Sequence, residues 1–183
     1  NKYKIRYFWL GVNKKNLPAI ESYKKAGFRI FREKNKDYKM LRDYNLLNLN
    51  RFSLGSAQFG MDYGINNYLG KTKFKEIKKI INFSQKIGIR SIDTAIAYGD
   101  AEKTLGKIGM KNFKVTSKLP YISENKLNDL EKIVKKSLKN LNIKKLNCLL
   151  IHSTKNLNNN TKAIFQKMKI LKSKGLVTKI GIS

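Results

Sequence analysis

The sequence has little cysteine, little proline and few acidic residues, and no long apolar run. Its single cysteine, Cys148, excludes a disulfide framework and favours a reducing compartment. No run approaches the roughly 20 apolar residues of a membrane span. The Lys-rich first residues are not followed by the apolar region of a signal peptide. We therefore expect a cytoplasmic protein without a membrane partner, and a buried Cys148 thiol.

Acidic residues are outnumbered: 12 Asp and Glu stand against 40 Lys and Arg, a formal charge of +28. Such a charge is typical of proteins that bind nucleic acid or acidic membranes. The lysines, however, occur on every expected helix rather than along one stripe. In addition, proteins that recognise bases and phosphates favour Arg over Lys. We interpret the charge as a solvated Lys-rich surface and predict no nucleic-acid partner. The alternative, a basic nucleic-acid-binding protein, predicts an affinity for nucleic acid that falls steeply with salt. Arginine occurs only at positions 6, 29, 32, 42, 51 and 90.

The chain of 183 residues, 41% of them apolar, could hold one domain or parts of two. It begins at Asn1 without Met and stops at Ser183 directly after an expected strand, so we expect a fragment of a longer protein. Residues 7–12 predict a strand, Pro18 starts a helix that ends at Gly27, and residues 28–32 and 38–41 predict two strands. Residues 43–50 are the expected linker.

From residue 51 strands and helices alternate, which is the signature of parallel βαβ units. The glycine-rich stretch at 55–60 (GSAQFG) lacks the spacing and the helix start of a dinucleotide-binding loop. We therefore expect an α/β fold: the first five βα units of a (β/α)8 TIM barrel, incomplete, with an apolar inner face and unpaired edges exposed. The expected strands are 52–55, 90–94, 114–118, 146–152 and 177–183, and the expected helices 73–86, 101–107, 127–141 and 162–174.

Four polar residues stand at or just after the ends of successive strands, where an α/β barrel keeps its chemistry: Asp93, Tyr98, Lys118 and His152. Reducing a carbonyl needs a proton for its oxygen and a hydride for its carbon. A phenol gives up its proton more readily beside an ammonium, so Lys118 could assist Tyr98 and Asp93 could hold Lys118. His152 could donate to the carbonyl oxygen, and a cofactor must supply the hydride.

Each of these residues also has a structural alternative. Asp93 could cap a helix, Tyr98 could pack, Lys118 could be a surface charge, and His152 could be a hydrogen-bonded strand end. Their occurrence together at one end of consecutive strands favours the chemical interpretation. No metal site is predicted.

The sequence of residues 51–183 resembles the aldo-keto reductases. The segments that carry the resemblance are LGSAQFG at 54–60, DTAIAYG at 93–99 with Glu102, SKLP at 117–120, LLIH at 149–152 and GLVTKIGIS at 175–183, in the family's order. The resemblance implies reduction of aldehydes, ketones or sugar carbonyls with NADPH, less often NADH. It makes Tyr98 the general acid, Lys118 and Asp93 its modulators and His152 the substrate-orienting residue.

The same resemblance makes Gly55 and Ser56 part of the loop that lines the nicotinamide pocket, and Ser183 the contact to the carboxamide. In the family, the segments that grip the cofactor's phosphates and adenosine lie on the last three βα units. The match stops after the fifth strand, so this segment alone is expected to be inactive.

Residues 1–42 resemble the closing segment of a GNAT-superfamily N-acetyltransferase, through LGV at 10–12, Asn16, AI at 19–20 and YKKAGF at 23–28. The resemblance implies that Asn16 lies near the pantetheine of acetyl-CoA and that Tyr23 protonates the departing thiolate. The alternative is that Asn16 is only a turn residue and that Tyr23 is only a core residue.

Together these observations predict part of a bifunctional cytoplasmic enzyme, an amino-sugar-type acetyltransferase ending near Leu41 and a reductase beginning near Arg51. The pairing suggests a nucleotide-sugar substrate. The alternatives are a non-catalytic cofactor-sensing or interaction module on a barrel fold, and a parent chain whose main activity is acetyl-CoA-dependent N-acetylation.

Overall fold

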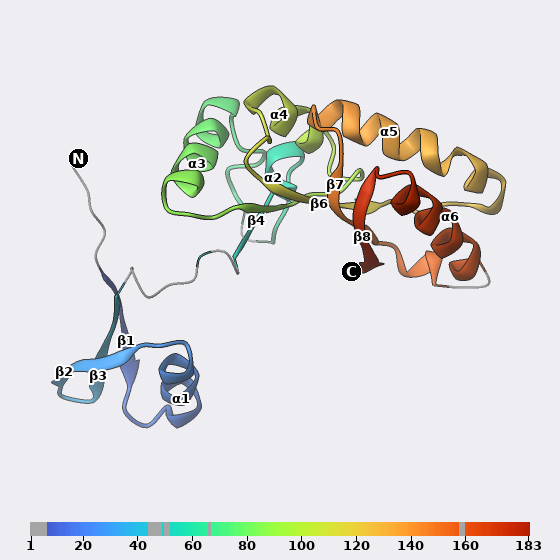
Figure 1. Ribbon diagram of the computed structural model, residues 1–183. Coiled ribbons are helices and arrows are strands. Elements are labelled where there is room, and N and C mark those ends of the chain that lie inside the picture. Colours follow the sequence, from blue (N-terminus) through green and yellow to red (C-terminus); the bar gives the residue numbers. More distant parts are fainter. Residues whose placement is uncertain (1–6, 44–48, 50–51, 66, 158–159) are drawn as a thin grey trace. The chain divides into compact units, whose positions relative to one another are not determined.

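The computed structural model describes residues 7–43, 49, 52–65, 67–157 and 160–183 (Figure 1). The chain divides into two compact units, Asn1–Asn48 and Leu49–Ser183, and each is described here by itself. Within the described part of the chain, no helix is both long enough and apolar enough to cross a membrane.

The first unit is a small antiparallel sheet with one helix, in the element order that the sequence predicts. Its strands pair in the order β1-β3-β2. The core consists of Val12, Ile20 and Met40, with Tyr23 and Phe28 packed against it. The elements are β1 (Tyr7–Asn13), α1 (Leu17–Lys25), β2 (Arg29–Lys34) and β3 (Asp37–Asp43).

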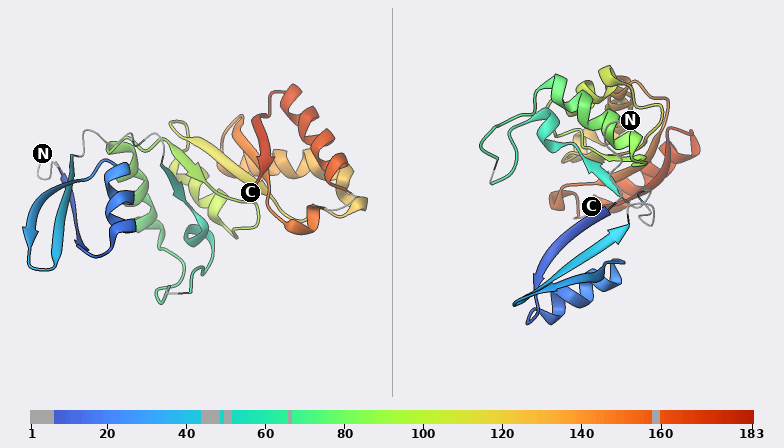
Figure 2. Two further views of the ribbon diagram at one scale, coloured as in Figure 1. Left: turned by 90° about the horizontal axis from the view of Figure 1, so that it is seen from below. Right: turned by 90° about the vertical axis from the view of Figure 1, so that its left-hand side faces the viewer.

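The second unit is a five-stranded parallel sheet whose strands pair in chain order, β4-β5-β6-β7-β8. No strand is skipped, so each βα unit adds one strand beside the previous one, as in the first part of a barrel. β4 and β8 form the two edges of the sheet (Figure 2). The strands are β4 (Ser53–Gly55), β5 (Ser91–Asp93), β6 (Lys114–Leu119), β7 (Leu146–Ile151) and β8 (Val177–Ile182).

The helices of this unit follow the strands along one side of the sheet (Figure 1). The expected helices are all present, and a one-turn helix, α2, begins directly after β4, where the sequence predicted no helix start. The helices are α2 (Ala57–Gly60), α3 (Phe74–Lys86), α4 (Ala101–Ile108), α5 (Leu130–Leu141) and α6 (Thr161–Ser173), with 3₁₀ turns η3 (Glu124–Asp129) and η4 (Thr154–Asn156).

The core lies between this helix layer and one face of the sheet. Successive strand residues point to opposite faces, and the register aligns Leu54, Ile92 and Val115 in one row on the helix side. The apolar stripe of α5 packs there through Val134, Leu138 and its neighbours. Burying one such side chain contributes about 1.5–3 kcal/mol, so this face holds the sheet and helices together.

The opposite, inner face was predicted to be apolar; it carries Leu150 beside Lys118 but also a row of small and polar side chains. One row across the sheet consists of Gly55, Asp93, Thr116, Cys148 and Lys179. The thiol of Cys148 is therefore half-buried rather than part of the core. Burial raises the pKa of this thiol, and the nearby charge of Lys179 acts in the opposite direction.

A buried carboxylate joins the sheet to two helices. Glu102 of α4 is 4% exposed. It accepts hydrogen bonds from Ser117 Oγ of β6 (2.8 Å) and from Ser137 Oγ of α5 (2.6 Å). Because a buried polar group is costly without partners, this contact orients β6, the strand that carries Lys118.

A partly exposed carboxylate joins the last two helices. Glu131 in the first turn of α5 contacts Lys135 of the same helix and Lys174, the C-cap of α6. Hydrogen bonds from Lys135 and then Lys174 lower the pKa of Glu131 from 4.5 to about 2.

We expect Glu131→Gln to lower the melting temperature near neutral pH and to have progressively less effect in acid. A lowered pKa contributes stability that is complete above the unfolded-state value of about 4.5 and is lost as the pH falls through about 2. The measurement is the melting temperature of both proteins between pH 7 and pH 2. Glu76→Gln, which removes an i,i+3 pair within α3, is the control for local charge loss. A Glu131→Gln deficit that stays constant or grows in acid would contradict this account.

Candidate active site

The C-terminal edge of the parallel sheet brings Lys118 and Asp93 into direct contact. Asp93 ends β5 and pairs with Thr116 of β6. Lys118 lies two residues after Thr116 on the same strand, so its side chain is on the same inner face. The ammonium Nζ of Lys118 lies 2.5 Å from Asp93 Oδ2. The contact is thus fixed by strand register and not by a flexible loop.

Lys118 is 5% exposed, which excludes the surface-charge alternative. Its ammonium donates to Asp93, to the backbone oxygen of Thr94 at 3.0 Å and to Tyr98 Oη at 3.4 Å. An ammonium has three protons to donate, so these three acceptors satisfy it. Burying such a charge without partners would be very unfavourable.

Tyr98 is placed by the turn that follows β5. The ladder continues past the strand, because Thr94 N donates to Thr116 O and Ile96 N to Lys118 O. Helix α2 packs tightly on this turn: a Cβ added to Gly60 would lie 1.8 Å from the backbone oxygen of Tyr98. Only glycine allows this approach, so α2 supports the position of Tyr98.

His152 follows β7 and completes the group. Its ring meets the ring of Tyr98 edge-on, with centroids 5.7 Å apart and planes at 84°. The structure therefore brings together all four residues that the sequence predicted to be catalytic. Asp93 contacts Lys118 and precedes no helix directly, since Asp100 is the residue at the N-cap of α4.

A second tyrosine, Tyr63, lies beside this group and was missed by the sequence analysis. Its ring centroid is 6.4 Å from that of Tyr98, and it is 55% exposed. It lies in the loop between α2 and α3, where Gln58 Nε2 and Asn67 Nδ2 both donate to its backbone oxygen. An aromatic residue in a loop without periodicity gives no signal that could have identified it.

The residues predicted to line a nicotinamide pocket also lie at this edge. A Cβ added to Gly55 would meet nothing within 4 Å, so open space adjoins that end of β4. The hydroxyls of Ser56 and Thr94 are buried and have no hydrogen-bond partner among the described residues. Ser183 is exposed just past β8, with its N–H donating to Ile151 O at 2.9 Å. Open space and unsatisfied hydroxyls together fit a flat ring that carries a carboxamide.

The two residues of the first unit have ordinary structural contacts. Asn16 caps α1, where its side chain accepts a hydrogen bond from Ala19 N at 3.2 Å. Tyr23 packs edge-on against Phe28, with ring centroids 6.0 Å apart. Their predicted acetyl-CoA contacts stay predictions.

Comparisons with known proteins agree with the architecture of the second unit. The model of the "Aldo/keto reductase family" matches residues 51–183. Among curated protein sequences, none is similar enough to this chain to count as a match.

Solved structures with the same fold include three aldo-keto reductases. PA4992 of Pseudomonas aeruginosa, named as an aldo-keto reductase, is 26% identical with a TM-score of 0.60, and the match covers 72% of this chain and 54% of that protein. AKR11C1 of Bacillus halodurans is 19% identical with a TM-score of 0.58, covering 72% and 45%. AKR2E4 of Bombyx mori, solved with NADP, is 22% identical with a TM-score of 0.56, covering 71% and 45%. The match thus spans about half the length of these structures.

The site geometry predicts an asymmetry between the two partners of the buried ion pair. Asp93→Ala leaves the Lys118 ammonium without its counter-charge and should lower the free energy of unfolding by about 1–3 kcal/mol. This loss is smaller than for a fully buried pair because Asp93 is partly exposed. Lys118→Met replaces the charge by an apolar side chain of similar length and should lower the free energy of unfolding by less than about 1 kcal/mol. Urea unfolding of the three proteins measures both. A Lys118→Met protein less stable than Asp93→Ala would refute this account.

Proposed function

Residues 51–183 make this chain a member of the aldo-keto reductase family, and from that premise we propose that its protein reduces the carbonyl group of an aldehyde or ketone. The observation that carries the proposal is the buried Lys118 ammonium, which lies 2.5 Å from Asp93 and 3.4 Å from Tyr98 Oη. A phenol coupled to a fixed ammonium is suited to give its proton to a carbonyl oxygen.

Each of the four residues has a distinct part in this reaction. Tyr98 donates its phenolic proton to the carbonyl oxygen, and Lys118 stabilises the phenolate that remains. Asp93 keeps Lys118 oriented, which makes Asp93 a positioning residue. His152, edge-on to Tyr98, donates a hydrogen bond to the same oxygen and fixes the carbonyl in front of the phenol.

A nicotinamide dinucleotide, NADP(H) or NAD(H), supplies the hydride when it is bound. Gly55, Ser56 and Ser183 would hold its nicotinamide end; the open space at Gly55 and the unsatisfied hydroxyl of Ser56 support this. The Bombyx mori neighbour was solved with NADP, which favours NADP(H). We propose the full-length protein as the active form, because the family resemblance assigns the phosphate and adenosine contacts to further βα units.

A Tyr98→Phe substitution in the full-length protein tests this proposal. Loss of the general acid should lower kcat by about 10²–10⁴-fold, while NADPH binding measured by fluorescence stays within about twofold. The carbonyl panel should include aldehydes, keto sugars and nucleotide-linked keto sugars.

Three outcomes of this experiment are informative. Turnover that survives Tyr98→Phe would remove Tyr98 from the mechanism. NADPH binding without turnover of any carbonyl, in both proteins, would replace the enzyme by a cofactor-sensing module. Turnover of other carbonyls but of no nucleotide-linked keto sugar would refute the prediction that the substrate is a nucleotide sugar.

We further propose that the first unit is the end of a cytoplasmic acetyl-CoA-dependent N-acetyltransferase joined to the reductase, with Asn16 and Tyr23 near acetyl-CoA. Its support is the segment of residues 10–28 quoted above. In the full-length protein, Tyr23→Phe should slow the release of CoA from acetyl-CoA in the presence of an amino sugar by about 10²-fold. Absence of any CoA release from the unsubstituted protein would refute this assignment and leave the reductase proposal untouched.

A further inference from the structure

A cavity of about 610 Å³ opens between α3 and α4 in the second unit. Lys71 and Lys73 line it from the segment before α3, and Lys103 and Lys107 line it from α4. None of the four catalytic residues lines this cavity, so it is separate from the site described above.

The cavity has an excess of three positive charges. Its only lining carboxylate is Asp100. That carboxylate is shared by two lysines, with Lys71 Nζ at 3.2 Å and Lys103 Nζ at 3.9 Å. Lys73 and Lys107 have no ion pair among the described residues. Like charges gathered in one concave space repel each other, and a bound anion relieves that repulsion.

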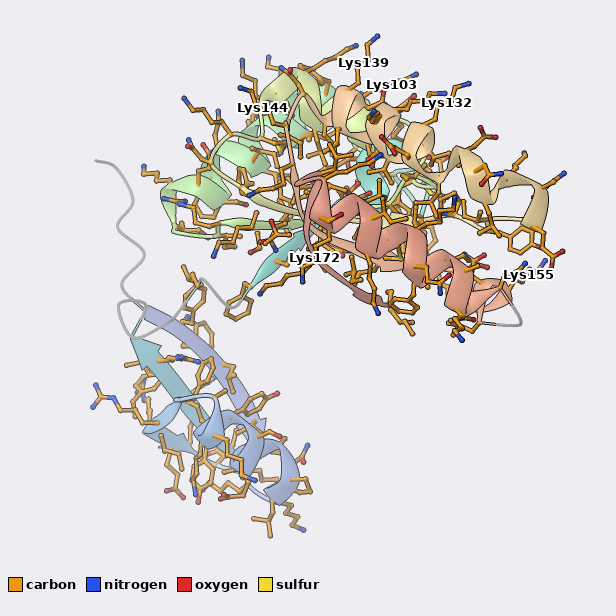
Figure 3. The ribbon with its side chains drawn as sticks, turned by 45° about the vertical axis from the view of Figure 1, so that its right-hand side comes forward. Lys103, Lys132, Lys139, Lys144, Lys155 and Lys172 are labelled. Carbon is orange, nitrogen blue, oxygen red and sulfur yellow. The ribbon has the colours of Figure 1, made fainter. Side chains whose placement is uncertain are left out.

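The cavity is not simply a sample of the Lys-rich surface. Lys103 and Lys107 are four residues apart on α4 and thus lie on one face, and that face turns toward the lysines before α3. Lys103 shares the outer surface of the helix layer with the exposed Lys132 and Lys139 of α5 (Figure 3), but of these three lysines only Lys103 lines the cavity. Lysines from two chain segments line this one cavity, and this distinguishes it from the rest of the Lys-rich surface.

Beneath the lysines the cavity is apolar. Ile77 and Phe59 are 1% and 4% exposed, whereas the ring of Phe74 is 48% exposed. A partly exposed aromatic ring provides a surface on which a flat base can stack. The hydroxyls of Thr72 and Thr104 add neutral hydrogen-bonding groups to the same walls.

We propose that this cavity binds a nucleoside diphosphate, with its phosphates among the four lysines and its base against Phe74. Lysine ammonium groups suit phosphate oxygens, and an apolar wall with a few polar groups is typical of small-molecule sites. The site is additional to the reductase site and does not depend on carbonyl reduction.

Calorimetric titration of the chain with uridine diphosphate tests the proposal, and pyrophosphate serves as the matched probe without a base. The uridine nucleotide avoids competition from an adenine-binding dinucleotide site. We expect one nucleotide per chain. The double variant Lys73→Gln/Lys107→Gln should weaken binding at least about tenfold, because two unpaired ammonium groups are lost. The double variant Lys132→Gln/Lys139→Gln removes the same charge elsewhere and should change it less than about twofold.

Phe74→Ala separates base from phosphate recognition. This substitution should weaken the binding of uridine diphosphate by about fivefold or more and leave the binding of pyrophosphate unchanged. Equal weakening by both double variants would reduce the effect to attraction by a diffuse Lys-rich surface and overturn the proposal. Uridine diphosphate that binds no more tightly than pyrophosphate would overturn the base contact. Because the readout is binding alone, these outcomes leave the reductase proposal untested and unharmed.

Discussion

The ammonium of Lys118, buried beneath the phenol of Tyr98, is the constraint on which the site depends. A buried lysine must find acceptors for its three protons, and here Asp93, the backbone oxygen of Thr94 and Tyr98 supply them. The same three contacts that make the charge tolerable also fix the phenol and hold a positive charge beside it. The contacts that accommodate the buried charge are therefore the same ones on which the proposed chemistry of Tyr98 depends.

The rest of the second unit keeps that interaction in place. Parallel register puts Asp93 and Lys118 on the inner face, and the ladder extends past the strand to Ile96. On the helix side, apolar rows and the buried carboxylate of Glu102 tie β6 to α4 and α5. The two faces differ: the apolar helix side stabilises the sheet, and the row of small and polar side chains on the inner face leaves open space at Gly55.

Most of the second unit could be predicted from sequence because its signals are local. Alternating apolar runs located every strand, helical spacing located the long helices, and polar residues at strand ends located Asp93, Tyr98, Lys118 and His152. The missed features depend on distant contacts. Tyr63 comes to Tyr98 through a loop without periodicity, α2 is a single turn held against the Tyr98 turn, and Cys148 faces inward because of strand parity. The lysine cavity exists only once α3 and α4 are side by side.

The most direct test of this account is nuclear magnetic resonance of the lysine side-chain ammonium groups at neutral pH. Exposed ammonium protons exchange rapidly with water, whereas those of a buried, fully hydrogen-bonded lysine exchange slowly. The account predicts a sharp ammonium signal that is absent in Lys118→Met and shifts or broadens in Asp93→Asn. If every lysine exchanges rapidly, or if the protected signal is indifferent to Asp93, then Lys118 is not held as described and the proposed role of Tyr98 loses its physical basis.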